Sequence, residues 1–202
     1  MSKRVYISAD YSPADGDRNV VEELHRWGND NYHRVDYTDT ALVMKGSVSE
    51  QPDCRPCDLK DEFNKQINAS SAVIFIIGDK TASRTAGSTC RRNSYGFLCS
   101  CTPYKQNANG STQCKVLNAT PAWYETDDVF KVNDYSYLRH EFEQAIKRNK
   151  TIIIVYNSLI RKPVWLPSYM RGYESNAHAF WKYDALGRKV GDYTYIKTAL
   201  GY

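Results

Sequence analysis

The stretch Ala72-Val-Ile-Phe-Ile-Ile77 decides the fold predicted for this chain. All of its residues are apolar, with no polar residue alternating between them, which is typical of a strand covered on both faces. The later stretch Thr151-Ile-Ile-Ile-Val155 has nearly the same pattern. Strands covered on both faces belong to parallel sheets, so the two stretches together predict a parallel sheet.

Strand and helix patterns alternate around these two stretches. Val5–Ser8 is expected to form a first strand and Arg34–Tyr37 a weaker second one. Between them, Asp17 can cap a helix whose apolar face contains Val20, Val21, Leu24 and Trp27. Asp58 can cap another helix, whose apolar face contains Leu59, Phe63 and Ile67. This alternation predicts an α/β doubly wound fold.

In a doubly wound fold, ligands bind beyond the carboxyl ends of the strands. The expected ends are Ser8–Tyr11, Thr38–Asp39, Gly78–Asp79 and Tyr156–Asn157. The stretch 79–134 has little periodicity and is far longer than an ordinary connection, which indicates an insertion or a lid. Near the end of the chain, His178–Tyr183 is expected to form a fifth strand, followed by a turn at Leu186–Arg188.

A helix between the insertion and the second apolar stretch contains the best candidate for chemistry, Glu141. Asp134 or Ser136 can cap this helix, whose apolar stripe is Leu138, Phe142, Ala145 and Ile146. Glu141 lies about 85° from the centre of the stripe, so we expect it on the rim, where it can border a cleft without being buried. Alternatively, Glu141 is a solvated helix residue paired with Arg139 or Lys147.

The length of 202 residues suits a single domain, 1–202, with the insertion at about 79–134. The net charge of +4 is spread along the chain, which argues against direct nucleic-acid binding. No stretch approaches the roughly 20 apolar residues of a membrane span, and the start of the chain has no signal-peptide pattern. These features predict a cytoplasmic protein without membrane attachment.

Four segments, taken in their order along the chain, resemble bacterial TIR-like domains, especially the TIR-like sensor proteins of Thoeris anti-phage defence. The segments are Lys3–Ser8, Ile76–Thr81, Arg139–Glu141 and Arg148–Ile153. The resemblance covers residues 3 to 80 and 135 to about 185, and it does not extend to the insertion. It implies a flavodoxin-like or TIR-like doubly wound sheet of about five strands, with a long Cys-containing insertion.

The resemblance also implies residue roles. In that family an aromatic residue commonly stands four positions before a glutamate that is needed to cleave NAD between nicotinamide and ribose, and Tyr137 and Glu141 match these positions. The family commonly has Trp where this chain has Tyr137. Ser8, Asp10 and Tyr11 match positions that line the nucleotide pocket.

Three further contacts with the substrate are expected. Gly78 is taken as a contact at the end of its strand, and Arg139 can meet the pyrophosphate. Tyr11 and Tyr137 can stack on the adenine or nicotinamide ring, although ordinary packing is the favoured alternative for each, and Arg139 can equally be an exposed helix cation.

One carboxylate is enough for this reaction, because nicotinamide in NAD is already a cationic leaving group. The carboxylate stabilises the oxocarbenium-like ribose as the bond lengthens. NAD is therefore expected as substrate, with no cofactor required, and no Gly-x-Gly-x-x-Gly loop follows the first strand. The resemblance favours a cyclic ADP-ribose product that signals to a separate effector, with a phage-derived activator or self-association switching the enzyme on.

The six cysteines lie in two patches, 54–57 and 90–114. Cys54 and Cys57, together with Cys99 and Cys101, have the approximate spacing of a structural zinc site. Unligated thiols, or a disulfide or redox pair, are the alternatives. The four histidines, His25, His33, His140 and His178, share no ligand spacing and are expected to be surface or packing residues.

Two other functions fit the same sequence. One is a non-catalytic TIR-like module that signals by oligomerising, since folds of this kind serve as scaffolds as well as enzymes. The other is glycosidic cleavage of a nucleoside, as in nucleoside deoxyribosyltransferases, which also combine an α/β fold with a carboxylate that handles the sugar.

Overall fold

The computed structural model describes residues 3–10, 17–45, 55–84 and 136–202, with residues 43–45, 55–58, 60 and 61 described by their backbone alone. Its main sheet has five strands, all parallel, in the order β2-β1-β3-β4-β5. The strands are β1 (Lys3–Ala9), β2 (Val35–Asp39), β3 (Ala72–Ile77), β4 (Thr151–Tyr156) and β5 (His178–Ala179). The predicted α/β fold with a parallel sheet is therefore confirmed.

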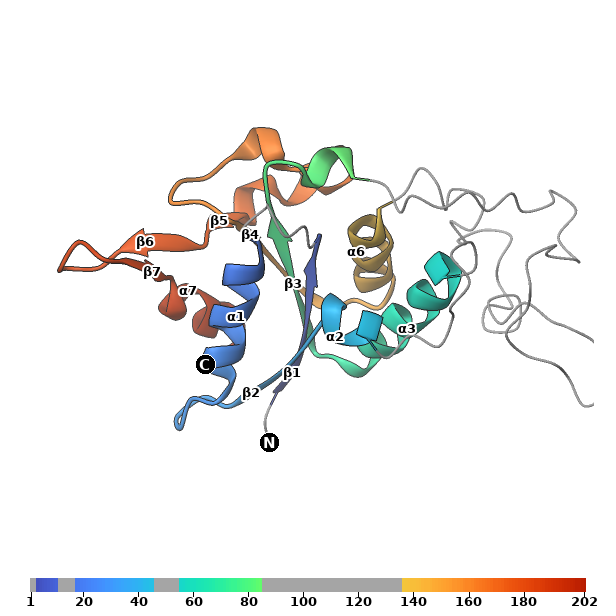
Figure 1. The fold of residues 1–202 in the computed structure, drawn as a ribbon, viewed down its shortest axis with the longest axis horizontal. Helices are drawn as coiled ribbons and strands as arrows, with labels where there is room; N and C mark the ends of the chain where they lie inside the picture. The colour runs from blue at the N-terminus through green and yellow to red at the C-terminus, as the bar shows by residue number, and fades with distance from the viewer. Residues whose placement is uncertain (1–2, 11–16, 46–54, 85–135) are drawn as a thin grey trace, which may run out of the picture.

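Helices cover both faces of the sheet, as expected of a doubly wound fold (Figure 1). One face packs against α1 (Asp17–Gly28) and α7 (Tyr193–Ala199). The other face packs against α3 (Arg55–Ala69) and α6 (Tyr137–Lys147), and the short helix α2 (Thr40–Lys45) follows β2 directly. The three-residue helix η1 (Thr81–Ser83) follows β3, and η3 (Pro163–Trp165) and η4 (Ser168–Asn176) follow β4.

The apolar faces predicted for the first two helices are both buried. Val20, Val21, Leu24 and Trp27 pack in the core on the α1 side, and Leu59, Phe63 and Ile67 are fully buried on the α3 side. Asp58 does not cap α3, because the helix begins three residues earlier at Arg55. In α6, Leu138, Phe142 and Ala145 are buried as predicted, whereas Ile146 is 42% exposed at the end of the stripe.

The predicted fifth strand, His178–Tyr183, is divided between two sheets. β5 ends at Ala179, and β6 (Trp181–Tyr183) pairs antiparallel with β7 (Lys189–Gly191) in a hairpin that projects from the body of the protein (Figure 1). Between β5 and β6, Phe180 is fully buried and its N–H donates to Tyr156 O. The chain therefore leaves the main sheet at Phe180. The turn predicted at Leu186–Arg188 is present, with Gly187 at a φ of +73°.

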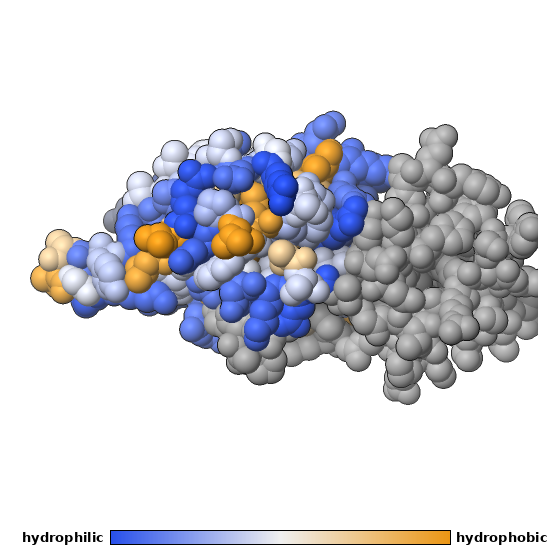
Figure 2. Space-filling model, turned by 90° about the horizontal axis from the view of Figure 1, so that it is seen from above, coloured by the Kyte–Doolittle hydropathy of each residue, from blue (hydrophilic) through white to orange (hydrophobic). Residues whose placement is uncertain are grey.

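Among the described residues, no helix combines the length and apolar character that crossing a membrane requires. On the face seen in Figure 2, apolar side chains form small patches within a largely hydrophilic surface. The most exposed large apolar side chains of the described segments are Tyr32, Val164 and Leu186.

Candidate functional site

Glu141 lies in the second turn of α6, and its carboxyl group points to the sheet. Ser136 caps the helix by accepting a hydrogen bond from Arg139 N, at 3.0 Å, which confirms one of the two predicted caps. Glu141 is only 1% exposed. Its Oε1 accepts a hydrogen bond from the Tyr6 hydroxyl at 2.6 Å, and its Oε2 accepts one from Ser8 Oγ.

The two hydroxyls that meet Glu141 come from one face of β1. Side chains alternate along a strand, so Tyr6 and Ser8 point to the α6 side while Ile7 points to the α1 side. Both hydroxyl residues are fully buried. A buried polar side chain is costly unless it is hydrogen-bonded, and here the hydroxyls and the carboxyl group satisfy one another.

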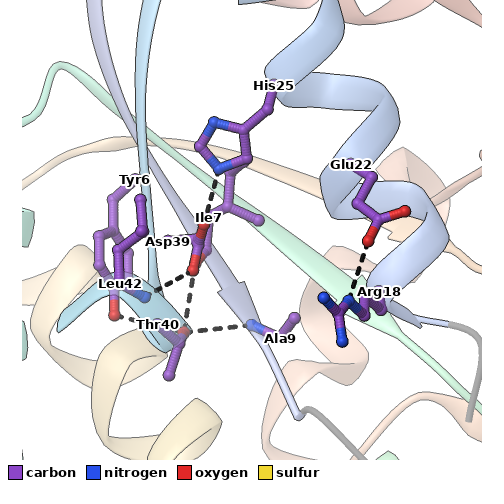
Figure 3. Close-up of polar contacts among 9 residues, drawn as sticks. All are labelled: Tyr6, Ile7, Ala9, Arg18, Glu22, His25, Asp39, Thr40 and Leu42. Atoms are coloured by element: carbon purple, nitrogen blue, oxygen red, sulfur yellow. Dashed lines mark hydrogen bonds and ion pairs between the residues drawn. The ribbon is translucent and has the colours of Figure 1, made fainter. Parts of the chain in front are cut away.

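Thr40, the first residue of α2, is the third hydroxyl at the site. Its Oγ1 accepts from Ala9 N at 3.4 Å, and it lies 3.2 Å from Ile7 O and 3.4 Å from Glu141 Oε1 (Figure 3 shows its contacts with β1). A hydroxyl has one proton to donate, so Thr40 shares it between Ile7 O and Glu141. The hydroxyls of Tyr6 and Ser8, which make the shorter hydrogen bonds, are therefore the principal donors to the carboxyl group.

The pKa of Glu141 is raised to about 8, chiefly by burial; the negative charge of Asp10 also raises it, and the hydrogen bonds from Ser8, Tyr6 and Thr40 act in the opposite direction. The carboxyl group is therefore mostly protonated at pH 7. A positive charge placed against it would favour the ionised form and lower its pKa. Glu141 thus has the environment expected of a functional carboxyl group whose ionisation depends on its ligand.

The expectation that Glu141 lies on the rim of the helix without being buried in the core is wrong, and so is the alternative that it is solvated, because its side chain is buried. Glu141 lies off the apolar stripe of its own helix, as predicted. However, β1 covers this side of the helix as well, so the residue is buried. Arg139 does not pair with Glu141: its Nε lies 3.0 Å from Glu143 Oε1.

Asp10 and Tyr169 border the site beyond the end of β1. Asp10 acts electrostatically on Glu141 and on Tyr169, and burial raises the pKa of the Tyr169 hydroxyl well above its usual value. The guanidinium of Arg139 lies 5.2 Å from the centre of the Tyr169 ring. The structure therefore brings Ser8, Asp10 and Arg139, three of the predicted substrate contacts, near Glu141.

Tyr137 and Gly78 do not join this group. The Tyr137 ring packs edge-on against Phe63, with ring centroids 5.6 Å apart, which is the packing alternative. Gly78 is buried on the α1 side of the sheet, where a Cβ atom would lie 2.9 Å from a carboxylate oxygen of Asp17. Gly78 therefore permits the close approach of α1 and β3.

Asp17 belongs to a second polar cluster at the carboxyl ends of β3 and β4. Its carboxylate, 1% exposed, accepts from Asn157 Nδ2 at 3.0 Å, and Asn157 Oδ1 accepts from Trp181 Nε1 at 2.8 Å. This cluster joins α1, the end of β4 and the projecting hairpin.

Several predicted site residues lie outside the described residues. They are Tyr11, Cys54, Cys99 and Cys101, together with the side chain of Cys57, whose backbone lies in α3. The structural zinc site and the Cys-containing insertion therefore stay predictions. Within the described ranges, no group of three or more His, Cys, Asp or Glu side chains is arranged to hold a metal ion.

Tyr6 and Thr40 were not among the predicted site residues. The signal for Tyr6 was present: Tyr6 and Ser8 are two hydroxyl residues, two positions apart, in a strand otherwise expected to be apolar on both faces. Thr40 follows the strand end Thr38–Asp39 that was singled out, but nothing in the sequence connects it with Glu141.

Comparison of the sequence with models of known protein families and with curated proteins gives no match.

Proposed function

We propose that this protein is a TIR-like enzyme that cleaves NAD between nicotinamide and ribose. The observation that carries the proposal is the buried Glu141 carboxyl group, which meets β1 and the start of α2 at the carboxyl end of the sheet. The strand order 2-1-3-4-5 supports it, because this is the order of flavodoxin-like folds, whose ligands bind at that end of the sheet.

In the proposed reaction, the bond between the ribose C1′ and the nicotinamide nitrogen breaks, and its electron pair leaves with nicotinamide. The ribose becomes oxocarbenium-like, and the Glu141 carboxylate stabilises the developing positive charge. The hydroxyls of Tyr6 and Ser8 hold the carboxylate in one orientation. Water then captures C1′ to give ADP-ribose, or a nucleophile within the substrate does so to give a cyclic product.

The raised pKa of Glu141 gives this proposal a distinctive pH dependence. Only the ionised form can stabilise the ribosyl cation, so kcat/KM should rise with pH through the pKa of about 8 in the free enzyme. The bound substrate carries a positive charge on nicotinamide, which favours ionisation. The corresponding rise in kcat is therefore expected at lower pH.

The cyclic ADP-ribose is the product that we propose, acting as a signal for a separate effector in anti-phage defence. This part rests on the resemblance of Lys3–Ser8 and Arg139–Glu141 to Thoeris TIR-like proteins. A phage component or self-association is the proposed trigger, so assays should be run with and without phage lysate. An oligomerising module without turnover remains the alternative if no base is released in either condition.

A second candidate function is cleavage of a nucleoside, and one observation favours it. Departure of a neutral base is helped by a proton donor, and a carboxyl group with a pKa of about 8 is protonated at neutral pH. For this reaction the rate should fall as the pH rises above about 8, which is opposite to the expectation for NAD.

Separate incubations with NAD and with deoxynucleosides, analysed by chromatography, distinguish the candidates by the base that is released. The proposal predicts nicotinamide release from NAD by the wild type, a loss of roughly 10²- to 10³-fold in Glu141→Gln, and no loss in Glu22→Gln, an exposed carboxylate on α1. Release of nucleobase alone would replace the proposal with the second candidate. Undiminished nicotinamide release by Glu141→Gln would overturn it.

A further inference from the structure

His25 and Asp39 form a close polar pair next to the candidate site. His25 is on α1, and its Nε2 lies 2.6 Å from Oδ2 of Asp39, the last residue of β2. The His25 side chain is 34% exposed, whereas that of Asp39 is only 7% exposed. The ring edge of Tyr37 packs nearby, with centroids 6.1 Å apart. No step of the proposed reaction uses this pair.

Asp39 has a second contact that fixes the start of α2. Its other oxygen, Oδ1, accepts a hydrogen bond from Leu42 N at 2.9 Å, which is the contact of a helix N-cap. One carboxylate therefore joins α1 to the first turn of α2. The register of β2 on β1 also places Asp39 opposite Ile7.

The residue fixed by this cap is Thr40, which contacts Glu141. Figure 3 shows His25 joined to Asp39, and Thr40 next along the chain, between the Tyr6 hydroxyl on one side and Ala9 N on the other. Thr40 Oγ1 lies 3.4 Å from Glu141 Oε1. A shift of the first turn of α2 would therefore move a hydroxyl against both β1 and Glu141.

We propose that His25 is a positioning residue for Glu141, acting through Asp39 and Thr40. Its hydrogen bond to Asp39 fixes the junction between β2 and α2, and the geometry of that junction determines the position of the Thr40 hydroxyl. The effect on turnover rests on the proposed function, whereas the effect on the Glu141 carboxyl group does not. A misplacement of the order of 1 Å at a reacting group can cost roughly 100-fold in rate. The contact between His25 and Asp39 can therefore influence catalysis although neither residue touches the reacting atoms.

The charged and titratable groups around this path are few in the described residues. Tyr6 from β1, Asp10 beyond β1 and Tyr169 from η4 face Glu141, and Asp39 also acts electrostatically on Tyr6. On α1, Arg18 and Glu22 form an exposed ion pair at 2.9 Å, which Figure 3 shows apart from the path. Glu22→Gln is therefore a matched control: it removes a polar pair from the same helix without touching Asp39 or Thr40.

The test compares His25→Leu and His25→Gln with the Glu22→Gln control. Gln has an amide nitrogen the same number of bonds from Cα as His Nε2, so it can keep the hydrogen bond to Asp39, whereas Leu cannot. We expect kcat for nicotinamide release to fall about tenfold in His25→Leu with little change in KM, and to recover most of that loss in His25→Gln. Glu22→Gln should match the wild type.

A second measurement needs no turnover. In protein labelled with ¹³C at glutamate side-chain carboxyls, the Glu141 signal is identified by its loss in Glu141→Gln. The Thr40 contact lowers the pKa of Glu141, so a displaced Thr40 hydroxyl in His25→Leu should raise the titration midpoint of Glu141 by about half a pH unit. His25→Gln and Glu22→Gln should leave the midpoint near that of the wild type.

These results separate the inference from the proposed function. If the wild type releases no nicotinamide but His25→Leu moves the Glu141 midpoint, the positioning role stands and the proposed function fails. If the wild type cleaves NAD and His25→Leu changes neither kcat nor the midpoint, the positioning role is overturned and the proposed function stands. An equal loss in His25→Gln and His25→Leu would also overturn it, because the hydrogen bond would then be irrelevant.

Discussion

The two faces of β1 are equally buried, but their side chains make different kinds of contact. On the α1 side, Val5, Ile7 and Ala9 pack in an apolar core. On the α6 side, Tyr6 and Ser8 are equally buried, but their hydroxyls meet the carboxyl group of Glu141. Stability needs only the first kind of face, since apolar residues of the right size would fill the second as well. This difference is the reason for placing the proposed site on the α6 side.

The two faces of β1 contribute to stability in different ways. An apolar face loses stability in proportion to the methyl groups that are removed. A polar face depends on its hydrogen bonds and on the protonation of Glu141, because an ionised carboxylate held away from water is unfavourable. Substitutions on the two faces should therefore differ in their dependence on pH as well as in size.

The largest effect that is independent of pH is expected on the apolar face. Ile7→Ala removes a fully buried side chain and should lower the free energy of unfolding by about 3 kcal/mol, measured by urea denaturation. The loss should be nearly equal at pH 6 and pH 9, because the packing of the Ile7 side chain in the apolar core does not depend on the protonation of Glu141 on the other face of the sheet. A loss below about 1 kcal/mol would mean that the α1 side is not close-packed.

The second effect concerns the protonation of Glu141. Its pKa is raised from 4.5 to about 8, so the folded protein keeps a proton that the unfolded chain releases. The stabilisation is complete below pH 4.5 and is lost as the pH rises through about 8. Wild-type stability relative to Glu141→Gln should therefore fall between these values, by at most about 1.4 kcal/mol per pH unit.

Chemical denaturation of both proteins across that pH range checks this prediction. The Gln variant serves as the reference for every other titrating group in the chain. Parallel curves for the wild type and Glu141→Gln would show that Glu141 has an ordinary pKa, and the polar face would then not differ from a solvated surface.

A smaller effect is expected from Tyr6→Phe, which removes the 2.6 Å donor to Glu141 and keeps the ring. The free energy of unfolding should fall by about 1 to 2 kcal/mol above pH 8, where the ionised carboxylate depends on its hydrogen-bond donors, and by less at pH 6. Loss of a donor to the charged form also raises the pKa of Glu141 further, so the rise of kcat/KM should move to higher pH. A stability loss that is the same at both pH values would contradict this account of the polar face.

The smallest effect is expected from Trp181→Phe, which removes the 2.8 Å hydrogen bond to Asn157 in the polar cluster on the α1 side. The cost should be about 0.5 to 1 kcal/mol, measured by denaturation. The titration of Glu141 should not change, because this cluster lies across the sheet from α6. A change in the Glu141 midpoint would show that the two sides of the sheet are coupled.

The sequence predicted the parallel sheet and most of the apolar helix faces, but it joined β5 and β6 into one strand. The bounds of β3 were predicted as found, because a run such as Ala72–Ile77 reports burial on both faces directly. The apolar faces of α1 and α3 were also found from their spacing. α2 was missed because its six residues are too few to show helical periodicity.

The site was predicted only in part, for a physical reason. Helical spacing places Glu141 relative to its own helix, but its burial is decided by Tyr6, Ser8 and Thr40, which lie more than 100 positions earlier in the chain. Local pattern therefore identified the carboxyl group and missed its partners. The contact between His25 and Asp39 was not predicted for the same reason, since the two residues lie on different elements.

The pH dependence of nicotinamide release from NAD, measured for the wild type and Glu141→Gln, tests the central claim most directly. We expect kcat/KM of the wild type to rise through about pH 8 and the variant to lose roughly 10²- to 10³-fold with no such rise. Release at the wild-type rate by Glu141→Gln, or the same pH profile in both proteins, would contradict the claim that the Glu141 carboxylate carries the reaction.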